Sequence, residues 1–313
     1  MPGCVRIPSA MRIEDDNGIS GLLKGDERKL CGGFGFTEGP IWVASDSALV
    51  FSDIPGNTMY RWRPGRDEAD VYRKPSGWSN GMTLDGSGRL VVCEHGGRRV
   101  SRGEYARPSE TVSLATAWAG KRLNSPNDVV VHSSGAIFFT DPTYGMDTGR
   151  VPAFGSPGQT QELDFQGVYR IAAGGALELT IAEGFSQPNG LAFSPDESVL
   201  YVGDSQERLI WRYPVGADLS PGTRTLFVDQ RNDPRRGAPD GMKVDSDGRL
   251  WTTGAGGVSV HTAEGSYLGV FEMDEHAANL TFGGADFSTL FLTAGTSVYA
   301  VETLVRGSVP GSR

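Results

Sequence analysis

The stretch "NGLAFSPDESVLYVGDS", residues 189–205, contains the building block that this chain repeats. Residues 199–202 form a compact apolar run that predicts a strand, and residues 195–197 supply a turn before it. The stretch is therefore expected to fold as strand, turn and strand. Reworded copies of it recur along the chain, and each copy opens with Asn, Asp or Glu.

Six copies can be aligned on their opening residue. Successive copies begin 42, 47, 62, 51 and 39 residues apart, around the ~40–50-residue spacing of the blades of a β-propeller. The copies are "EGPIWVASDSALVFSDI" from Glu38, "NGMTLDGSGRLVVCEH" from Asn80, "NDVVVHSSGAIFFTDP" from Asn127, "NGLAFSPDESVLYVGDS" from Asn189, "DGMKVDSDGRLWTTGA" from Asp240 and "NLTFGGADFSTLFLTA" from Asn279.

Each copy continues with short segments that alternate apolar and polar residues. A third segment such as "GVYRIAA" follows every copy, and a fourth such as "TRTLFVDQ" follows most of them. Alternation of this kind is typical of half-buried strands. We therefore expect an all-β fold, a six-bladed β-propeller with four-stranded antiparallel blades. The last copy lacks a fourth segment, and "LKGDERKLCGG", residues 23–33, is expected to close that blade as an N-terminal strand.

The unbroken series of copies predicts a single domain over residues 1–313. The ring is expected to span roughly residues 22–303, with an N-terminal extension (1–20) and a C-terminal tail (304–313) at its periphery. The longest step contains an insertion rich in Gly and Pro, residues 142–166, and long loops often carry function. A β-sandwich or a pair of smaller domains is the rival architecture, but no proline-rich or charged linker marks a boundary.

Composition and charge exclude several classes of partner. The net charge is −9 and no run of Lys and Arg is present, which argues against nucleic acid. No stretch reaches the ~18 uninterrupted apolar residues of a membrane helix, and the N-terminus shows no signal peptide. Cys4, Cys31 and Cys93 are odd in number and form no CxxC pair. We expect a cytoplasmic protein, a monomer or weak homodimer, without nucleic-acid or membrane partners.

The opening residues all carry side-chain oxygen, and a propeller would bring them together. The first residue of each inner strand lies beside the central channel, so these side chains are expected to converge there. Asn-Gly and Asp-Gly are also common turn dipeptides, and each copy taken alone is open to that interpretation. Glu38, however, is no turn-former, and proline precedes the opening residue in "SPND", "QPNG" and "APDG".

A ring of hard oxygen donors favours Ca²⁺, with Mg²⁺, Mn²⁺ or Zn²⁺ as substitutes. Among these substitutes Zn²⁺ is disfavoured, because no His or Cys opens a copy.

Several long phrases resemble the SMP-30/gluconolactonase/luciferin-regenerating-enzyme-like family, above all its bacterial gluconolactonase-like branch. They follow the family's order over residues 36–251 and are "FTEGPIWV", "CEHGGRRV", "RLNSPNDVVV", "IFFTDPTYG", "QPNGLAFSPDE" and "DGMKVDSDGRLW". The resemblance implies a six-bladed propeller with a metal ion. The ligands that it implies are Glu38, Asn127, Asn189 and Asp240.

Two of the opening residues and one later position depart from this implied set. Asn80 and Asn279 share the repeat position, but the family does not generally use them as ligands. Some related phosphotriesterase-type propellers bind a second, structural calcium with an aspartate three residues after the catalytic one. This chain has Lys243 there, so the resemblance does not extend to that second ion.

The reaction that the resemblance implies is Ca²⁺-dependent hydrolysis of a lactone, a cyclic ester. Calcium polarises a carbonyl less than zinc does, so a base must share the task. Asp240 is the candidate, as a metal ligand with a second oxygen that takes a proton from the attacking water. The sequence leaves open whether Asp240 is base or nucleophile, which lactone or ester is the substrate, and which ion is used.

Further candidates for substrate binding follow from their positions in the repeat. Asn80 opens its copy, His95 ends the second strand in "CEHGG", and Tyr144 heads the insertion in "DPTYG". Three more precede Asn127 in "GKRLNSPND", namely Lys121, Arg122 and Asn124. These side chains are expected to bond substrate hydroxyls or a carboxylate, or to donate to the leaving alkoxide. A structural role for His95 and a solvated loop for Lys121 and Arg122 are the alternatives. His132, His261 and His276 carry no motif and are interpreted as structural or surface residues.

Two classes of function remain. A Ser-His-Asp hydrolase is excluded because no GxSxG stands between a strand and a helix. The first remaining class is a calcium-dependent lactonase, or a family member that acts on another ester or phosphoester or in a biosynthetic step. The second is a propeller that binds a small ligand or a protein partner without chemistry. Replacing Asp240 by Asn distinguishes the two classes. A hydrolase would lose its activity, whereas a binding propeller would keep its affinity for the ligand.

Overall fold

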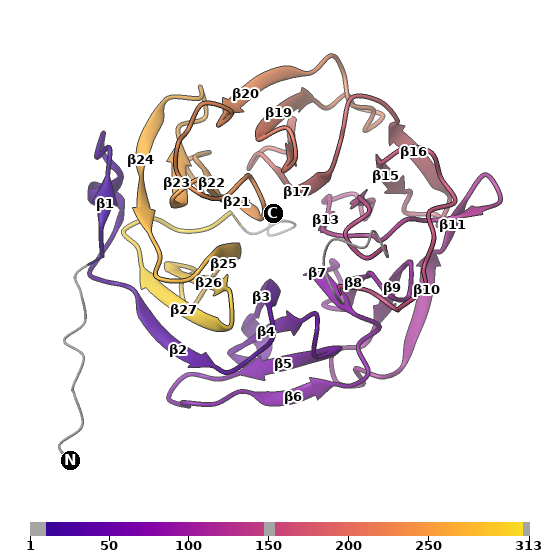
Figure 1. Ribbon diagram of the computed structural model, residues 1–313, viewed down its shortest axis with the longest axis horizontal. Coiled ribbons are helices and arrows are strands. Elements are labelled where there is room, and N and C mark those ends of the chain that lie inside the picture. The colour runs from indigo at the N-terminus through magenta and orange to yellow at the C-terminus, as the bar shows by residue number, and fades with distance from the viewer. Residues whose placement is uncertain (1–10, 147–153, 309–313) are drawn as a thin grey trace.

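Six small antiparallel sheets stand in a ring around a central channel (Figure 1). They are seen in a computed structural model that describes residues 11–146 and 154–308. The described residues form no α-helix, only the short 3-10 helices η1 (Ile19–Leu22) and η2 (Ala44–Asp46). No helix among them is long and apolar enough to cross a membrane. The predicted all-β, six-bladed propeller is confirmed.

Each blade has its first strand at the channel and its last strand outside. Blade 1 consists of β3 (Thr37–Val43), β4 (Ala48–Asp53), β5 (Thr58–Trp62) and β6 (Asp70–Arg73). Blade 2 consists of β7 (Ser79–Leu84), β8 (Leu90–Glu94), β9 (Arg99–Gly103) and β10 (Thr111–Ala115). Blade 3 consists of β13 (Val129–Val131), β14 (Ile137–Asp141), β15 (Gly167–Ile171) and β16 (Leu177–Ile181). Blade 4 consists of β17 (Pro188–Phe193), β18 (Val199–Asp204), β19 (Leu209–Pro214) and β20 (Thr225–Asp229). Blade 5 consists of β21 (Met242–Val244), β22 (Leu250–Gly254), β23 (Gly257–His261) and β24 (Tyr267–Glu272). Blade 6 consists of β25 (Ala277–Gly283), β26 (Thr289–Ala294), β27 (Ser297–Glu302) and β2 (Arg28–Gly32).

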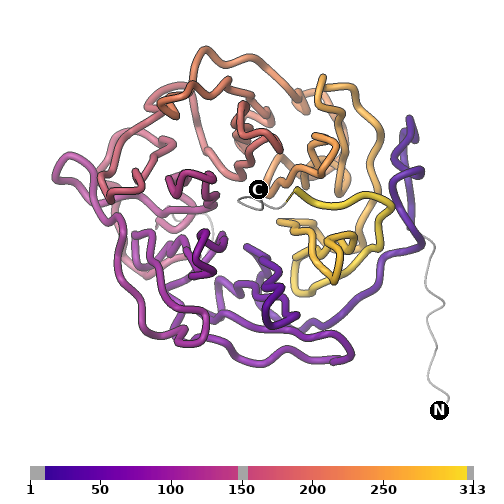
Figure 2. The backbone as a smooth tube through the Cα atoms, turned by 180° about the vertical axis from the view of Figure 1, so that it is seen from behind, coloured from indigo at the N-terminus to yellow at the C-terminus, as the bar shows by residue number. Residues whose placement is uncertain are grey.

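The ring is closed by the N-terminal strand, as predicted. β2 pairs antiparallel with β27, so that Gly32 lies opposite Ser297. The pairing covers the open edge of the last blade. Beyond β27 the chain turns inward, where Gly307 forms a bridge with Asp245 just after the inner strand β21 (Figure 2).

Two short elements were not predicted. β1 (Ile13–Glu14) adds a fifth strand at the outer edge of blade 5, where Ile13 lies opposite Phe271. β11 (Ala117–Trp118) and β12 (Lys121–Arg122) form a separate hairpin between blades 2 and 3. Each of these strands has two residues, which is too short for a hydrophobic period to show in the sequence.

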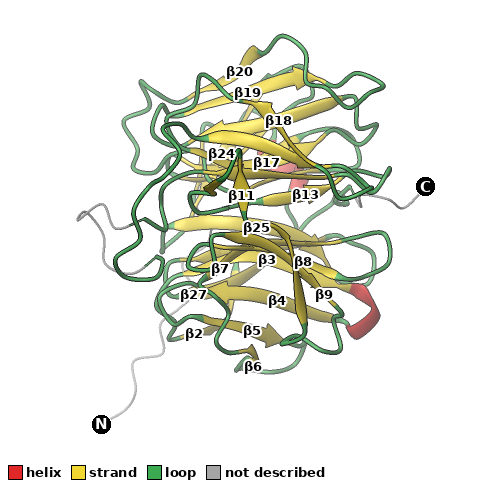
Figure 3. Cartoon of the chain, turned by 90° about the vertical axis from the view of Figure 1, so that its right-hand side faces the viewer, coloured by secondary structure: helices red, strands yellow, loops and turns green. Residues whose placement is uncertain are grey.

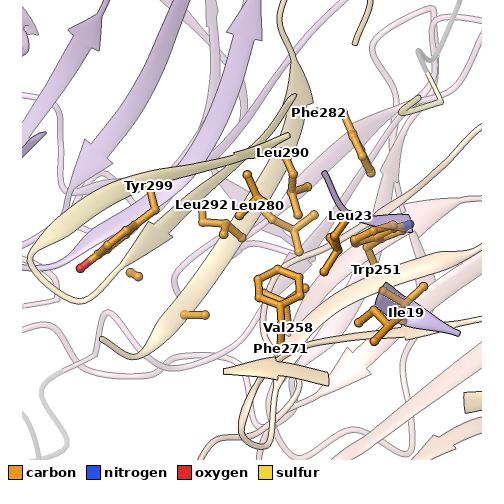
Figure 4. Close-up of a cluster of buried hydrophobic side chains, with 14 residues drawn as sticks. Ile19, Leu23, Trp251, Val258, Phe271, Leu280, Phe282, Leu290, Leu292 and Tyr299 are labelled. Carbon is orange, nitrogen blue, oxygen red and sulfur yellow. The ribbon is translucent and has the colours of Figure 1, made fainter. Parts of the chain in front are cut away.

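Apolar packing between neighbouring blades forms the core. The cluster between blades 5 and 6 contains Trp251, Phe271 and Leu280, and η1 adds Ile19 (Figure 4). Trp251 and Phe282 meet edge to face with ring centroids 5.6 Å apart. Seen from the side, the strands run through the thickness of the ring and the loops gather on its two faces (Figure 3). Because the core lies between the blades, functional residues are expected in the channel or in the loops on the two faces.

Candidate active site

The innermost strands bring the opening residues of the six copies to the channel (Figure 1). Glu38, Asn80, Asn189 and Asn279 lie within β3, β7, β17 and β25. Asn127 and Asp240 lie two residues before β13 and β21. The turn interpretation is therefore wrong for the Asn-Gly pairs at 80 and 189, which belong to strands.

Glycine follows the opening residue because the inner strands approach each other closely around the axis. A Cβ at position 190 would lie 2.0 Å from the carbonyl oxygen of Asp240, and one at position 241 would lie 2.1 Å from the carboxamide of Asn279. Gly190 also donates its N–H to that Asp240 oxygen at 3.1 Å. Only glycine allows this approach without a clash.

Carboxylates at the ends of the second strands hold the loops that precede the opening residues. Asp53 ends β4 and accepts the N–H of Phe36 at 3.1 Å. Asp204 ends β18 and accepts the N–H of Gln187 at 3.1 Å. Asp141 ends β14 and holds the corresponding loop of blade 3. These bonds fix the backbone from which the site side chains project.

A cavity of about 230 Å³ lies over the inner ends of the blades. Seven of the predicted site residues line it, namely Glu38, Asn80, His95, Asn127, Tyr144, Asn189 and Asp240. Phe36, Ile54, Phe154, Ser205, Ala238 and His276 complete the lining. Residues 147–153 of the insertion are outside the described residues, and Tyr144 and Phe154 flank them.

Glu38 is held by its neighbours through one oxygen. Its Oε2 accepts the N–H of Gly39 at 2.7 Å and Nδ2 of Asn279 at 3.0 Å. Oδ1 of Asn279 accepts the N–H of Leu280 at 2.8 Å, so both polar atoms of this carboxamide have a partner. Oε1 of Glu38 has no hydrogen-bond partner among the described residues and remains available for a ligand.

Asn189 is held in a similar way. Its Nδ2 donates to Oγ of Ser205 at 2.9 Å, and Oγ of Ser205 donates to the carbonyl of Pro239 at 2.6 Å. Tyr144 and Asp240 line the same cavity beside this pair. Oδ1 of Asn189 accepts no hydrogen bond among the described residues.

The electrostatics of the site show a shortage of positive charge. Burial raises the pKa of Glu38 to about 7. Burial, and then the charges of Glu38 and Asp128, raise the pKa of Asp240 well above its ordinary range. A cation among these oxygens would offset the repulsion. In the described parts of the chain, no group of three or more His, Cys, Asp or Glu side chains is placed to hold a metal ion. The cavity lining combines two carboxylates with carboxamides.

His95 is a neutral residue of the site. Burial lowers its pKa to about 4. Its Nδ1 lies 2.9 Å from the carbonyl of Phe154, which can only accept, so Nδ1 carries the proton. Nε2 then accepts Nδ2 of Asn80 at 3.2 Å. Oδ1 of Asn80 is buried without a hydrogen-bond partner in the described structure.

Comparison with known proteins adds the family. A model of the SMP-30/Gluconolactonase/LRE-like region matches residues 36–296. The chain belongs to this family. A gluconolactonase of Zymomonas mobilis is 34% identical over 293 residues, which cover 87% of this chain and 80% of the relative. A solved gluconolactonase structure from Xanthomonas campestris is 35% identical and covers 94% of this chain and 95% of its own, with a TM-score of 0.83. A pentonolactonase of Haloferax volcanii is 28% identical and covers 82% of this chain and 80% of its own.

Three of the predicted substrate-binding residues do not line the cavity of this SMP-30/gluconolactonase-like protein. Lys121 and Arg122 are exposed in β12. Asn124 is fully buried, and its Nδ2 donates to the carbonyls of Asp141 and Phe165 at 3.1 and 2.9 Å. It therefore fixes the loop before Asn127 and does not face the site.

The sequence analysis did not identify several other residues that line the cavity, although the repeat position of Ser205 could have indicated it. Ser205 follows the acid that ends a second strand, the same repeat position as His95, and so does Ile54. Of the residues at this repeat position, only His95 was predicted to bind substrate. His276, interpreted as structural or surface, is exposed at the rim of the cavity. Phe154 could not be placed, because nothing in the insertion's sequence predicts that it folds back over the channel.

Proposed function

We propose that the chain hydrolyses a sugar lactone with one divalent metal ion, Ca²⁺ in the first place, held by Glu38, Asn127, Asn189 and Asp240. The observation that carries this proposal is the convergence of these four side chains, from four blades, on one cavity. The relatives named for gluconolactone and pentonolactone hydrolysis support the reaction class.

The residues present fit such an ion. Two carboxylates and two carboxamides offer the oxygen ligands that Ca²⁺ prefers. Oε1 of Glu38 and Oδ1 of Asn189 are left unengaged while their partner atoms are held by hydrogen bonds. When bound, the ion would supply Lewis acidity to the lactone carbonyl.

Asp240 is proposed as the general base. Asp240 is partly exposed and lines the cavity. A divalent ion held beside Asp240 would keep its carboxylate ionised and so able to accept a proton. It takes a proton from water while the water oxygen bonds to the carbonyl carbon. The ring C–O bond then breaks, and the proton ends on the leaving alkoxide.

The remaining lining residues are proposed to hold the sugar. Oδ1 of Asn80 accepts from a substrate hydroxyl, and its orientation is fixed by His95. Tyr144 lines the same cavity and offers a hydroxyl. Phe36 and Phe154, with ring centroids 5.2 Å apart, supply an apolar wall for the carbon skeleton.

The test is a pH-stat assay on aldonolactones and simple aliphatic lactones. EDTA-treated protein is expected to be inactive and to regain activity with Ca²⁺ more than with Mg²⁺, Mn²⁺ or Zn²⁺, above a buffer blank for spontaneous hydrolysis. Asp240→Asn and Glu38→Gln are each expected to abolish turnover. Turnover near that of the wild type in either variant rejects the proposal, and lactone binding without turnover would instead support a binding module.

A further inference from the structure

A second cavity, of about 430 Å³, lies beside the candidate site. It is lined by residues of blade 5 and of the connections that join this blade to blades 4 and 6. His276 lines both cavities. The loop before Asp240 also runs along both, because Arg236 lines the second cavity and Ala238 the first. The two cavities are therefore neighbours with a shared wall.

Glycine residues form one side of this second cavity. The turn from β22 to β23 reads Gly-Ala-Gly-Gly, and Gly254, Gly256 and Gly257 all line the cavity. A Cβ at position 256 would lie 2.8 Å from Cδ of Arg235, and one at position 257 would lie 2.3 Å from the carbonyl oxygen of Phe271. The cavity therefore has bare backbone where other residues would place a side chain.

Hydrogen bonds hold the walls of the second cavity in place. Glu275, next to His276, accepts the N–H and the hydroxyl of Thr296 at 2.7 and 2.9 Å. On the opposite wall the carbonyl of Arg236 accepts the N–H of Gly256 at 2.8 Å. A ligand would therefore meet a cavity that is already formed, which lowers the cost of binding.

Three side chains that line the second cavity are left for a ligand. Arg236, Asp274 and His276 are exposed, and their side chains have no hydrogen bond or ion pair with any other described residue. Arg235, by contrast, is engaged, since its Nη2 donates to Asp233 at 2.6 Å. The guanidinium of Arg236 donates, the carboxylate of Asp274 accepts and the imidazole of His276 can do both.

The charges around the second cavity favour a neutral ligand. Two arginines and three acidic residues line it, so that an anion would meet more negative than positive charge; these residues are Arg235, Arg236, Glu272, Asp274 and Glu275. A hydroxyl group both donates and accepts hydrogen bonds, and so suits an arginine beside a carboxylate. A sugar residue carries several hydroxyl groups on one ring and has no charge.

We propose that the second cavity binds the glycosyl residue of a glycosylated aldonolactone, so that the substrate class is the lactone of a disaccharide acid. This inference rests on the proposed function, because it takes the lactone ring to lie in the first cavity. That cavity, at about 230 Å³, is smaller than the ~300–1,000 Å³ of most ligand pockets, so a substituent on the lactone must lie outside it. Arg236 and Asp274 bond hydroxyl groups of the glycosyl residue, and His276 lies where the two parts of the substrate meet.

Initial rates in a pH-stat, above a buffer blank, test this inference. The substrates are glucono-1,5-lactone and the 1,5-lactones of maltobionic, cellobionic and melibionic acid, which differ in the linkage of the second sugar. The wild type is expected to show a KM about fivefold lower for at least one disaccharide lactone than for glucono-1,5-lactone. Arg236→Ala and Asp274→Ala are each expected to remove this preference. Arg66→Ala and Asp67→Ala, exposed between β5 and β6, are the matched controls and are expected to keep it.

The other outcomes overturn the inference. They are a wild type without the preference, and variants at positions 236 and 274 that keep it. An effect of Arg236→Ala that is confined to 6-phosphoglucono-1,5-lactone would identify an anion site instead. Each of these results leaves the proposed function intact, because glucono-1,5-lactone is still hydrolysed. A protein that hydrolyses none of the lactones overturns both.

Discussion

Asn279 donates a hydrogen bond from Nδ2 to Oε2 of Glu38 at 3.0 Å and so joins the last blade to the first. Its Oδ1 is engaged by the N–H of Leu280, so Asn279 orients the carboxylate and offers no oxygen to an ion. The opening residues of the repeat are therefore divided between residues that face the cavity and a residue that orients one of them.

Replacing Asn279 by Ala is expected to weaken calcium binding, because Glu38 then loses the bond that fixes its free oxygen. Loss of a residue that orients a ligand typically costs about 10–100-fold in metal affinity. Titration calorimetry with Ca²⁺ measures the effect. Asn232→Ala, an exposed loop substitution, is the control and is expected to bind like the wild type. Equal affinity of the two variants would show that Asn279 does not orient Glu38.

Ser205→Ala is expected to disturb Asn189 in the same way. The variant removes the acceptor of Nδ2 and the link to Pro239, so the carboxamide can rotate and present nitrogen instead of oxygen. We expect calcium affinity and kcat to fall together by about tenfold. Ser109→Ala, exposed and remote, is the control. If kcat stays at the wild-type value, Ser205 has no such role.

Asn80→Ala tests substrate recognition. The variant removes an unpartnered acceptor that lines the cavity, so binding of a polyhydroxylated lactone is expected to lose about one hydrogen bond. That loss corresponds to a rise in KM of about fivefold for glucono-1,5-lactone. γ-Butyrolactone, which has no ring hydroxyl, serves as the control substrate. A rise of equal size for both lactones would argue for a general disturbance of the site.

The metal-free protein is expected to be destabilised by the ionisation of Glu38. Burial raises the pKa of Glu38 from 4.5 to about 7, so the folded state binds more protons than the unfolded state between these values. Raising the pH through this window therefore costs stability. Glu38→Gln mimics the protonated form, and its gain in Tm over the wild type in EDTA should grow from near zero at pH 5 to a few degrees at pH 8.

The comparison of variant with wild type cancels the buried groups that Glu38 does not affect. Asp240, whose pKa the charge of Glu38 raises, adds to the difference in the same direction. Burial also raises the pKa of Asp141 to about 7 and lowers that of His95 to about 4, but both are the same in the two proteins. Scanning calorimetry at constant ionic strength gives the two curves. Saturating Ca²⁺ is expected to reverse the order above pH 7. A difference in Tm that does not depend on pH would contradict the raised pKa.

The blades could be predicted because the repeat carries two signals at once. Alternating apolar residues mark each strand, and an Asp-Gly or Ser-Gly turn joins the first two strands of three copies, as at Asp245–Gly248. The closing strand could be predicted because the last copy has no fourth strand-like segment, so the N-terminal segment had to supply it. β1 and the β11–β12 hairpin could not be predicted, since strands of two residues carry no period.

The candidate site was predictable where it coincides with the repeat and not elsewhere. Glu38 and Asp240 share a repeat position, and the ring geometry brings them to one cavity. The full engagement of Asn279 depends on a contact 241 residues away in sequence, which no local pattern contains. Phe154 lines the cavity although no repeat or periodicity in the sequence around it predicts this position.

The most direct measurement of the central claim is a crystal structure of the protein in Ca²⁺. We predict one calcium ion bound at about 2.3–2.6 Å by side-chain oxygens of Glu38, Asn127, Asn189 and Asp240. A cavity that stays free of calcium at saturating concentration, or an ion bound by a different set of side chains, would contradict the account.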